Sequence, residues 1–201
     1  EASSNPSRKT LPQIRESEYE GLARKMELKE WRPDFGPEEF NPRSGATVIG
    51  ARKFLIAFNV NLKSLNLAKE IAGKIRESGV KKEIGGQEIR IPGEFKELKA
   101  LGIELKERSL AQVSMNLTDY KITGMRAVFE RIKELAREKG IEIASGEIVG
   151  LLPLEAILES GRFYASGSDS EEDLIKAAIK NLKLDKFSDF DPLKKIIEYM
   201  I

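Results

Sequence analysis

Apolar residues recur along this chain with two spacings, one typical of strands and one typical of amphipathic helices. Aromatic and β-branched runs or strict alternation predict strands at 53–62, 99–108, 110–120 and 141–152, the last with a possible break at Ser145–Gly146. Apolar positions at helical spacing predict helices at 66–78 and 124–139, which Gly79 and Gly140 would close. This order predicts an α+β fold: a ferredoxin-like β-α-β-β-α-β sheet with the helices on one face.

The segments before and after this core have weaker patterns. The first fifteen residues are polar with two prolines, which favours an extended segment, and residues 17–30 have helical spacing. Residues 32–50 contain three prolines and three glycines and predict a long structured loop. Residues 80–97 favour a loop or a marginal hairpin. Further C-terminal helices are expected after Pro153, at Ser170 and at Asp191–Pro192.

Composition narrows the possible chemistry. The chain has 201 residues, no Cys and no His, so thiolate-bound metals, His-bound metals and His-based triads are excluded within it. The 34 basic and 33 acidic residues leave a net charge of +1, which argues against a nucleic-acid binder. No apolar run has the length of a membrane span, and we expect a cytoplasmic protein. The chain opens at Glu1 rather than Met, which indicates a processed or partial polypeptide.

Three groups of polar residues could bind a ligand. Gln112, Ser114 and Asn116 alternate with apolar residues, so their side chains would lie together on one sheet face, where they bind a ligand or are simply solvated. Glycines in the 32–50 loop could cradle an anion or serve only as turn residues. Lysines in the 80–99 segment could attract an acidic tail, although interleaved glutamates favour an ordinary mixed-charge surface.

Five long sequence blocks carry more information than periodicity does. In order along the chain they read SRKTLPQIRESEYEGL, EWRPDFGPEEFNPRSGATVIGARKFLIAFNVNL, SLAQVSMNLTDY, GEIVGLLPLEAIL and FDPLKKIIEYMI. Together they closely resemble the glutamate formiminotransferase (glutamate formimidoyltransferase) family of folate-dependent histidine degradation. The resemblance implies two domains: residues 1–50, an arm and loop from the end of the first family subdomain, and residues 51–201, the whole second subdomain.

The resemblance implies transfer of a formimino group from N-formiminoglutamate to N5 of tetrahydrofolate, with folate as substrate and no metal. The first subdomain carries the family's catalytic His; this chain has none, so no catalytic residue is assigned here. The base would come from that subdomain, in the same or a separate chain. We expect a homo-oligomer that binds neither nucleic acid nor membrane. Formyl transfer on the same scaffold, and a non-catalytic folate-binding or interaction module, remain the alternatives.

The resemblance also assigns a folate-binding loop. It comprises Gly36, Pro37, Glu38, Glu39, Phe40, Asn41, Pro42, Arg43, Ser44 and Gly45. We expect a reduced folate to lie between this loop and the Gln112, Ser114 and Asn116 stripe, which is inferred from alternation alone.

Overall fold

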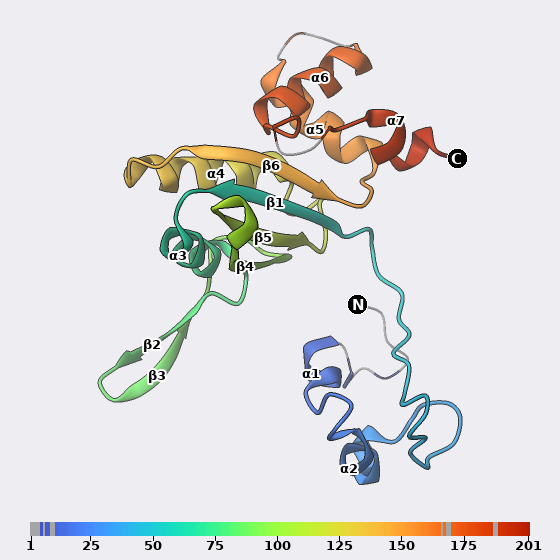
Figure 1. Ribbon diagram of the computed structural model, residues 1–201. Coiled ribbons are helices and arrows are strands. Elements are labelled where there is room, and N and C mark those ends of the chain that lie inside the picture. The colour runs from blue at the N-terminus through green and yellow to red at the C-terminus, as the bar shows by residue number, and fades with distance from the viewer. Residues whose placement is uncertain (1–4, 6, 9–10, 166, 168–169, 187–188) are drawn as a thin grey trace. The chain divides into compact units, whose positions relative to one another are not determined.

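A computed structural model of the chain describes residues 5, 7–8, 11–165, 167, 170–186 and 189–201 (Figure 1). The chain divides into two compact units, Glu1–Lys53 and Phe54–Ile201. The first unit is mostly irregular, and the second holds both sheets and the longer helices. In the part that the structure describes, no helix is long and apolar enough to cross a membrane.

Short helices and turns make up the first unit. They are α1 (Leu11–Arg15), α2 (Leu22–Glu27) and the 3₁₀ helix η1 (Lys29–Trp31). The extended segment predicted for residues 1–15 is wrong at α1, which is helical. Pro12 occupies the second helical position, where its missing N–H costs no intrahelical hydrogen bond. Its residues 1–4, 6 and 9–10 lie outside the described residues.

The helix predicted over residues 17–30 is wrong in its first third. Glu18 adopts a positive φ of 49°, and the Gly21 amide donates to the Ser17 carbonyl at 2.9 Å. A Cβ at Gly21 would lie 2.7 Å from that same carbonyl oxygen. This tight turn therefore precedes α2, and only the later apolar positions of the predicted helix are helical.

The second unit is built around a four-stranded sheet. Its strands are β1 (Ile56–Leu62), β4 (Leu98–Leu105), β5 (Leu110–Leu117) and β6 (Ile143–Val149). Their order is β4-β5-β1-β6, and every neighbouring pair is antiparallel. The predicted α+β class is confirmed, and β6 continues through Ser145 and Gly146 as one strand.

Two helices, α3 (Leu65–Ile75) and α4 (Met125–Glu138), bury the apolar face of this sheet. The rings of Phe58 in β1 and Phe129 in α4 lie 6.4 Å apart. A Cβ at Gly102 in β4 would lie 2.4 Å from the Lys69 amide nitrogen of α3, so this helix needs a glycine there. The helix predicted to reach residue 78 ends at Ile75, and Gly79 instead turns the chain at a φ of +59°.

The sequence favoured either a loop or a marginal hairpin for residues 80–97, and residues 80–91 form a hairpin. It consists of β2 (Val80–Ile84) and β3 (Gln87–Ile91), which make a separate two-stranded sheet. Gly85 and Gly86 connect them with φ values of +62° and +79°. Positive φ at both central residues is the geometry of a type I′ turn, which glycine adopts without strain.

The C-terminal region contains the expected helices. They are α5 (Leu154–Tyr164), α6 (Glu171–Asn181) and α7 (Pro192–Lys195), followed by the 3₁₀ turn η3 (Ile197–Tyr199). Another 3₁₀ turn, η2 (Lys106–Arg108), lies between β4 and β5. The side chains of Ser170 and Asp191 cap α6 and α7 as predicted. A parallel bridge between Leu152 and Ile196 ties the end of the chain to the segment that follows β6.

Candidate functional site

The sheet face that points away from α3 and α4 is polar at its centre. Cross-strand register arranges it in three rows: Ile103–Gln112–Asn61–Ser145, Leu101–Ser114–Asn59–Glu147 and Lys99–Asn116–Ala57–Val149. At its margins Leu101 and Val149 are 62% and 53% exposed. These twelve residues are called the uncovered face below.

Hydrogen bonds join the central polar side chains of the uncovered face into one network. The Gln112 amide nitrogen donates to Asn61 Oδ1 at 2.9 Å and to Glu147 Oε2 at 3.1 Å. Asn61 in turn donates to Ser145 Oγ at 3.0 Å, and Asn59 donates to Glu147 Oε2 at 3.4 Å. Buried amides are stable only when they are hydrogen-bonded, and here each amide supports its neighbour.

The atoms left over in this network are acceptors. Among the described residues, Gln112 Oε1 and Glu147 Oε1 receive no hydrogen bond, and no Lys or Arg lies within ion-pair distance of Glu147. Gln112 is buried and Glu147 is half-buried. The face therefore offers fixed oxygen acceptors to a ligand that carries N–H donors.

The other two members of the predicted stripe are less constrained. Ser114 is half-buried and Asn116 is exposed, and neither side chain bonds to any residue that the structure describes. Val113, Met115 and Leu117, which alternate with them, are fully buried on the helix-covered face. The predicted alternation is confirmed, while a role of the stripe in folate binding stays a prediction.

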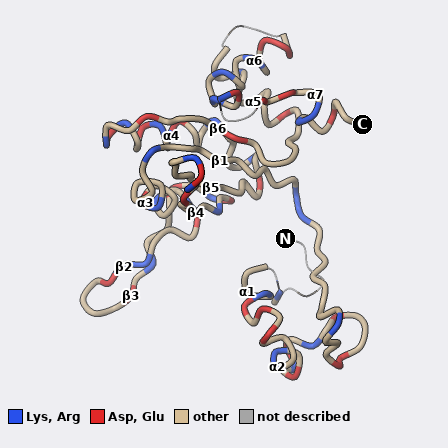
Figure 2. The backbone as a smooth tube through the Cα atoms, viewed as in Figure 1, with Lys and Arg blue, Asp and Glu red and all other residues tan. Residues whose placement is uncertain are grey.

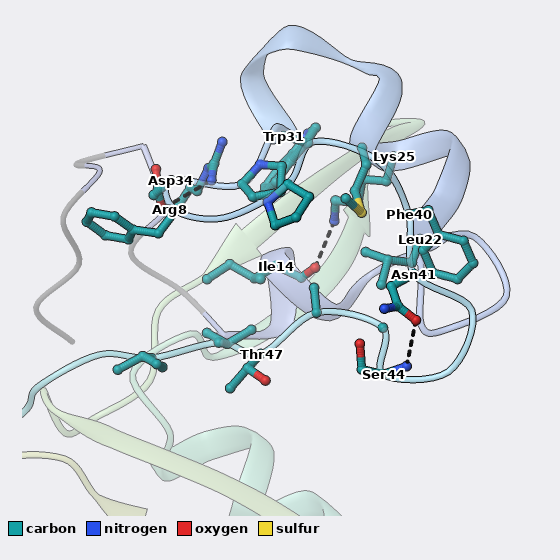
Figure 3. A pocket seen from close by; sticks show the side chains of 18 of the residues that line it. Arg8, Ile14, Leu22, Lys25, Trp31, Asp34, Phe40, Asn41, Ser44 and Thr47 are labelled. Carbon is teal, nitrogen blue, oxygen red and sulfur yellow. Dashed lines mark hydrogen bonds and ion pairs between the residues drawn. The ribbon is translucent and has the colours of Figure 1, made fainter.

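The predicted loop lies in the first unit, where it lines an open concavity of about 1360 Å³ (Figure 3). Of the ten loop residues, the lining includes Pro37, Glu39, Phe40, Asn41, Pro42, Arg43, Ser44 and Gly45, but not Gly36 or Glu38. Apolar side chains of the helical segments, Ile14, Leu22 and Trp31, line its other parts. Lys25 donates to the Ile14 carbonyl at 3.0 Å, and its ammonium lies 4.0 Å from the centre of the Trp31 ring.

Local hydrogen bonds shape the loop. Asn41 Oδ1 accepts from the amide nitrogens of Arg43 and Ser44 at 2.9 and 3.3 Å, and Tyr19 donates to the Pro42 carbonyl at 2.6 Å. Glu38 pairs with Arg32 at 3.1 Å, so this carboxylate is directed to a protein cation.

Arg43 differs from the other charged members of this loop. It is exposed, and its guanidinium has no partner among the residues that the structure describes. Arg43 is therefore the loop's available cation for a ligand carboxylate.

The loop and the stripe belong to different units. The structure brings the stripe together with polar side chains that were not among the predicted site residues, namely Asn59, Asn61, Ser145 and Glu147. The two asparagines alternate within the predicted strand 53–62, so the same pattern that selected the stripe was present there. Ser145 and Glu147 required the register of β6 against β1. The prediction that one folate contacts both loop and stripe stays a prediction.

Acidic side chains do not gather into a metal centre within the described ranges. No group of three or more Asp or Glu residues there is arranged to hold a metal ion.

Two family models match the chain in succession. The formiminotransferase domain, N-terminal subdomain, matches residues 1–52, and the formiminotransferase domain matches residues 57–201. The chain is 44% identical to the formimidoyltransferase-cyclodeaminase of Mus musculus and 47% identical to that of Dictyostelium discoideum. Both alignments cover all of this chain and 37% of the relative.

A shorter relative carries a single activity in its name. The chain is 34% identical to the glutamate formimidoyltransferase of Streptococcus pyogenes serotype M1 over 171 residues, which are 84% of this chain and 53% of that protein. The chain thus spans little more than a third of its longer relatives and about half of this one.

Proposed function

Because the chain belongs to the formiminotransferase family, we propose that it is the folate-binding part of a glutamate formiminotransferase. In this proposal the complete enzyme transfers a formimino group from N-formiminoglutamate to tetrahydrofolate in histidine degradation. The names of the relatives support the transferase class. The observation that carries the folate assignment is the hydrogen-bonded network on the uncovered face.

The leftover acceptors fit the polar edge of a reduced pterin. That edge carries a ring N–H beside an amino group, which are donors and need acceptors when the ring leaves water. Glu147 Oε1 and Gln112 Oε1 are acceptors on side chains that the network already holds in place. A carboxylate acceptor forms the stronger type of hydrogen bond, so Glu147 contributes the larger share of pterin affinity.

The loop of the first unit offers a different type of contact. Arg43 has an exposed guanidinium, and folate ends in a glutamate with two carboxylates. A guanidinium matches a carboxylate with two parallel hydrogen bonds. In this proposal Arg43 binds a carboxylate of the folate tail.

The transfer itself requires a base for the N5 proton and donors for the tetrahedral intermediate. N5 forms the new bond to the formimino carbon, the bond from that carbon to the glutamate nitrogen breaks, and this nitrogen leaves with a proton. The family resemblance implies that the catalytic His belongs to the first subdomain, and this chain contains no histidine. In this proposal the base therefore comes from that subdomain, in the same or a separate chain. This chain supplies binding and orientation.

The test compares the chain alone with the chain combined with the N-terminal subdomain. Glutamate release is measured with tetrahydrofolate and either N-formiminoglutamate or N-formylglutamate as donor. We expect turnover only in the combination and with the formimino donor. Turnover with N-formylglutamate but not with N-formiminoglutamate would favour formyl transfer. Folate binding without turnover by either donor would favour the non-catalytic module, and an inert combination that binds no folate would overturn the assignment.

A further inference from the structure

The β2–β3 hairpin extends away from the four-stranded sheet and its helices (Figure 1). Among the described residues, no other strand pairs with it, and every residue from Lys81 to Ile91 is exposed. Ile84, Ile89 and Ile91 are 53%, 43% and 37% exposed on one of its faces. An isolated two-stranded hairpin has marginal stability, and its free edges are templates for further strand pairing.

The charges within the hairpin are arranged unfavourably. Lys81 lies directly opposite Arg90, and Glu83 lies directly opposite Glu88, so both charged cross-strand pairs join like charges. Directly opposite like charges destabilise a sheet. The diagonal ion pair of Lys81 and Glu88 at 2.6 Å offsets only part of this repulsion. Figure 2 shows the result, with basic residues near the base of the hairpin and acidic residues nearer its tip.

The backbone fixes which residues of the free edge can accept another strand. Ile84 and Gln87 flank the two-residue turn and therefore form a hydrogen-bonded pair. Alternation then directs the backbone N–H and C=O groups of Glu88 and Arg90 away from β2. These two residues are separated by one position, so they can pair with each other across a two-fold axis.

We propose that β3 pairs antiparallel with β3 of a second copy of this chain, about a two-fold axis at Ile89. In this register Glu88 of each copy forms a hydrogen-bonded pair with Arg90 of the other, and the two Ile89 side chains meet on the axis. Across the resulting four-stranded sheet, neighbouring side chains then follow in the order Lys81 and Arg90 of one copy, then Glu88 and Glu83 of the other. The two-fold axis generates a second, identical row. The repelling pairs of one hairpin thereby gain oppositely charged neighbours.

The other edge of the hairpin is unsuited to such pairing. The same alternation on β2 directs the backbone groups of Lys81 and Glu83 outward. A two-fold axis there would pass through Lys82 and place two lysines opposite each other. On β3 the axis residue is instead Ile89, and its side chain belongs to the exposed apolar face of the hairpin. The β3 edge is therefore the one that pairs.

Charge reversal on β3 separates this pairing from the stability of the hairpin. Glu88→Arg and Arg90→Glu each convert a like-charge pair inside the hairpin into an attractive one. Each also makes both Glu88–Arg90 contacts between copies repulsive. We expect self-association of the 201-residue chain, measured by sedimentation velocity over a concentration series, to weaken roughly tenfold or more in either variant. The double variant restores the attraction, and so restores the association.

An equimolar mixture of the Glu88→Arg and Arg90→Glu variants tests the proposed register most directly. Residues 88 and 90 are then both arginine in one chain and both glutamate in the other, so we expect a heterodimer although each variant alone associates weakly. Glu83→Arg, with the same charge change on β2, is the matched control and should leave association within about threefold. A wild-type chain that stays monomeric, single variants that associate like the wild type, or a mixture without heterodimer would overturn the proposal.

Discussion

The two faces of the four-stranded sheet use the same strands for opposite purposes. On the helix-covered face β1 presents Phe58 and Val60, which are fully buried against apolar side chains. On the uncovered face the alternating residues Asn59 and Asn61 are also buried, at 6% and 0% exposure, but in a network of hydrogen bonds. Burial alone therefore does not distinguish a structural face from a candidate binding face; the kind of contact does.

This difference has a functional meaning. The apolar face gains stability from area removed from water, and its contacts are complete within the chain. The network on the uncovered face is ordered but retains unused acceptors on Gln112 and Glu147. Side chains that are ordered in advance lose less entropy when a ligand arrives. Mutations on the helix-covered face should therefore affect folding alone, whereas mutations in the network of the uncovered face should affect ligand binding as well as stability.

The largest expected effect is on the helix-covered face. Phe58→Ala removes a fully buried ring that packs near Phe129, so we expect the free energy of unfolding to fall by about 3–5 kcal/mol. Ser114→Ala, its counterpart on the uncovered face, should change it by about 0.5 kcal/mol or less. Urea denaturation of both variants measures the contrast, and equal losses would show that the two faces contribute alike.

The second effect tests the network itself. Glu147→Ala leaves the Gln112 and Asn59 amides without their shared acceptor, which should lower the free energy of unfolding by about 1–3 kcal/mol. Glu147→Gln retains one acceptor oxygen and should cost less than Glu147→Ala. The same denaturation experiment measures both variants. If both were as stable as the wild type, the network would contribute nothing to the fold.

The third effect concerns an ion pair outside both faces. Arg131 donates to both carboxylate oxygens of Glu94, at 2.7 and 2.9 Å, and these bonds hold the pKa of Glu94 below its ordinary value of 4.5. A depressed folded-state pKa contributes stability above the unfolded pKa and loses it as the pH falls through the folded value. Glu94→Gln should therefore cost about 1 kcal/mol or less near neutral pH, because this pair is partly exposed.

The pH dependence separates this charge effect from a packing effect. Below the ordinary pKa the difference between Glu94→Gln and the wild type should shrink, and it should vanish once the folded wild type is also protonated. Thermal denaturation from pH 7 down to about pH 3 measures it. A stability difference that stays constant across this range would mean that Glu94 acts through packing rather than charge.

Periodicity predicted the second unit well because its elements bury one face each. The alternation of Val113, Met115 and Leu117 identified β5 and its helix-covered face, and the spacing of residues 124–139 identified α4 to within a residue at each end. The caps at Ser170 and Asp191 could be predicted because a side-chain oxygen at this position accepts a hydrogen bond from a backbone amide of the first helical turn.

The first unit and the complete network were harder to predict for physical reasons. The turn at Glu18 opposes the helical spacing of residues 17–30, and no periodic pattern records such a turn. Four of the five network residues lie outside the strand of the predicted stripe. Asn61 and Glu147 contact Gln112 only because of the strand register, which a single sequence does not display. The loop residues 36–45 were assigned by resemblance, since glycines and prolines alone indicate only a turn.

The central claim is that the uncovered face binds a reduced folate. Calorimetry of the chain combined with the N-terminal subdomain tests this claim most directly. Gln112→Ala combined with Asn116→Ala should weaken tetrahydrofolate binding by roughly fivefold or more while the protein remains folded, as circular dichroism would verify. Asn181→Ala, an exposed amide on α6, is the control and should bind as the wild type does. Unchanged affinity in a well-folded double variant would contradict the claim and leave the face as ordinary sheet surface.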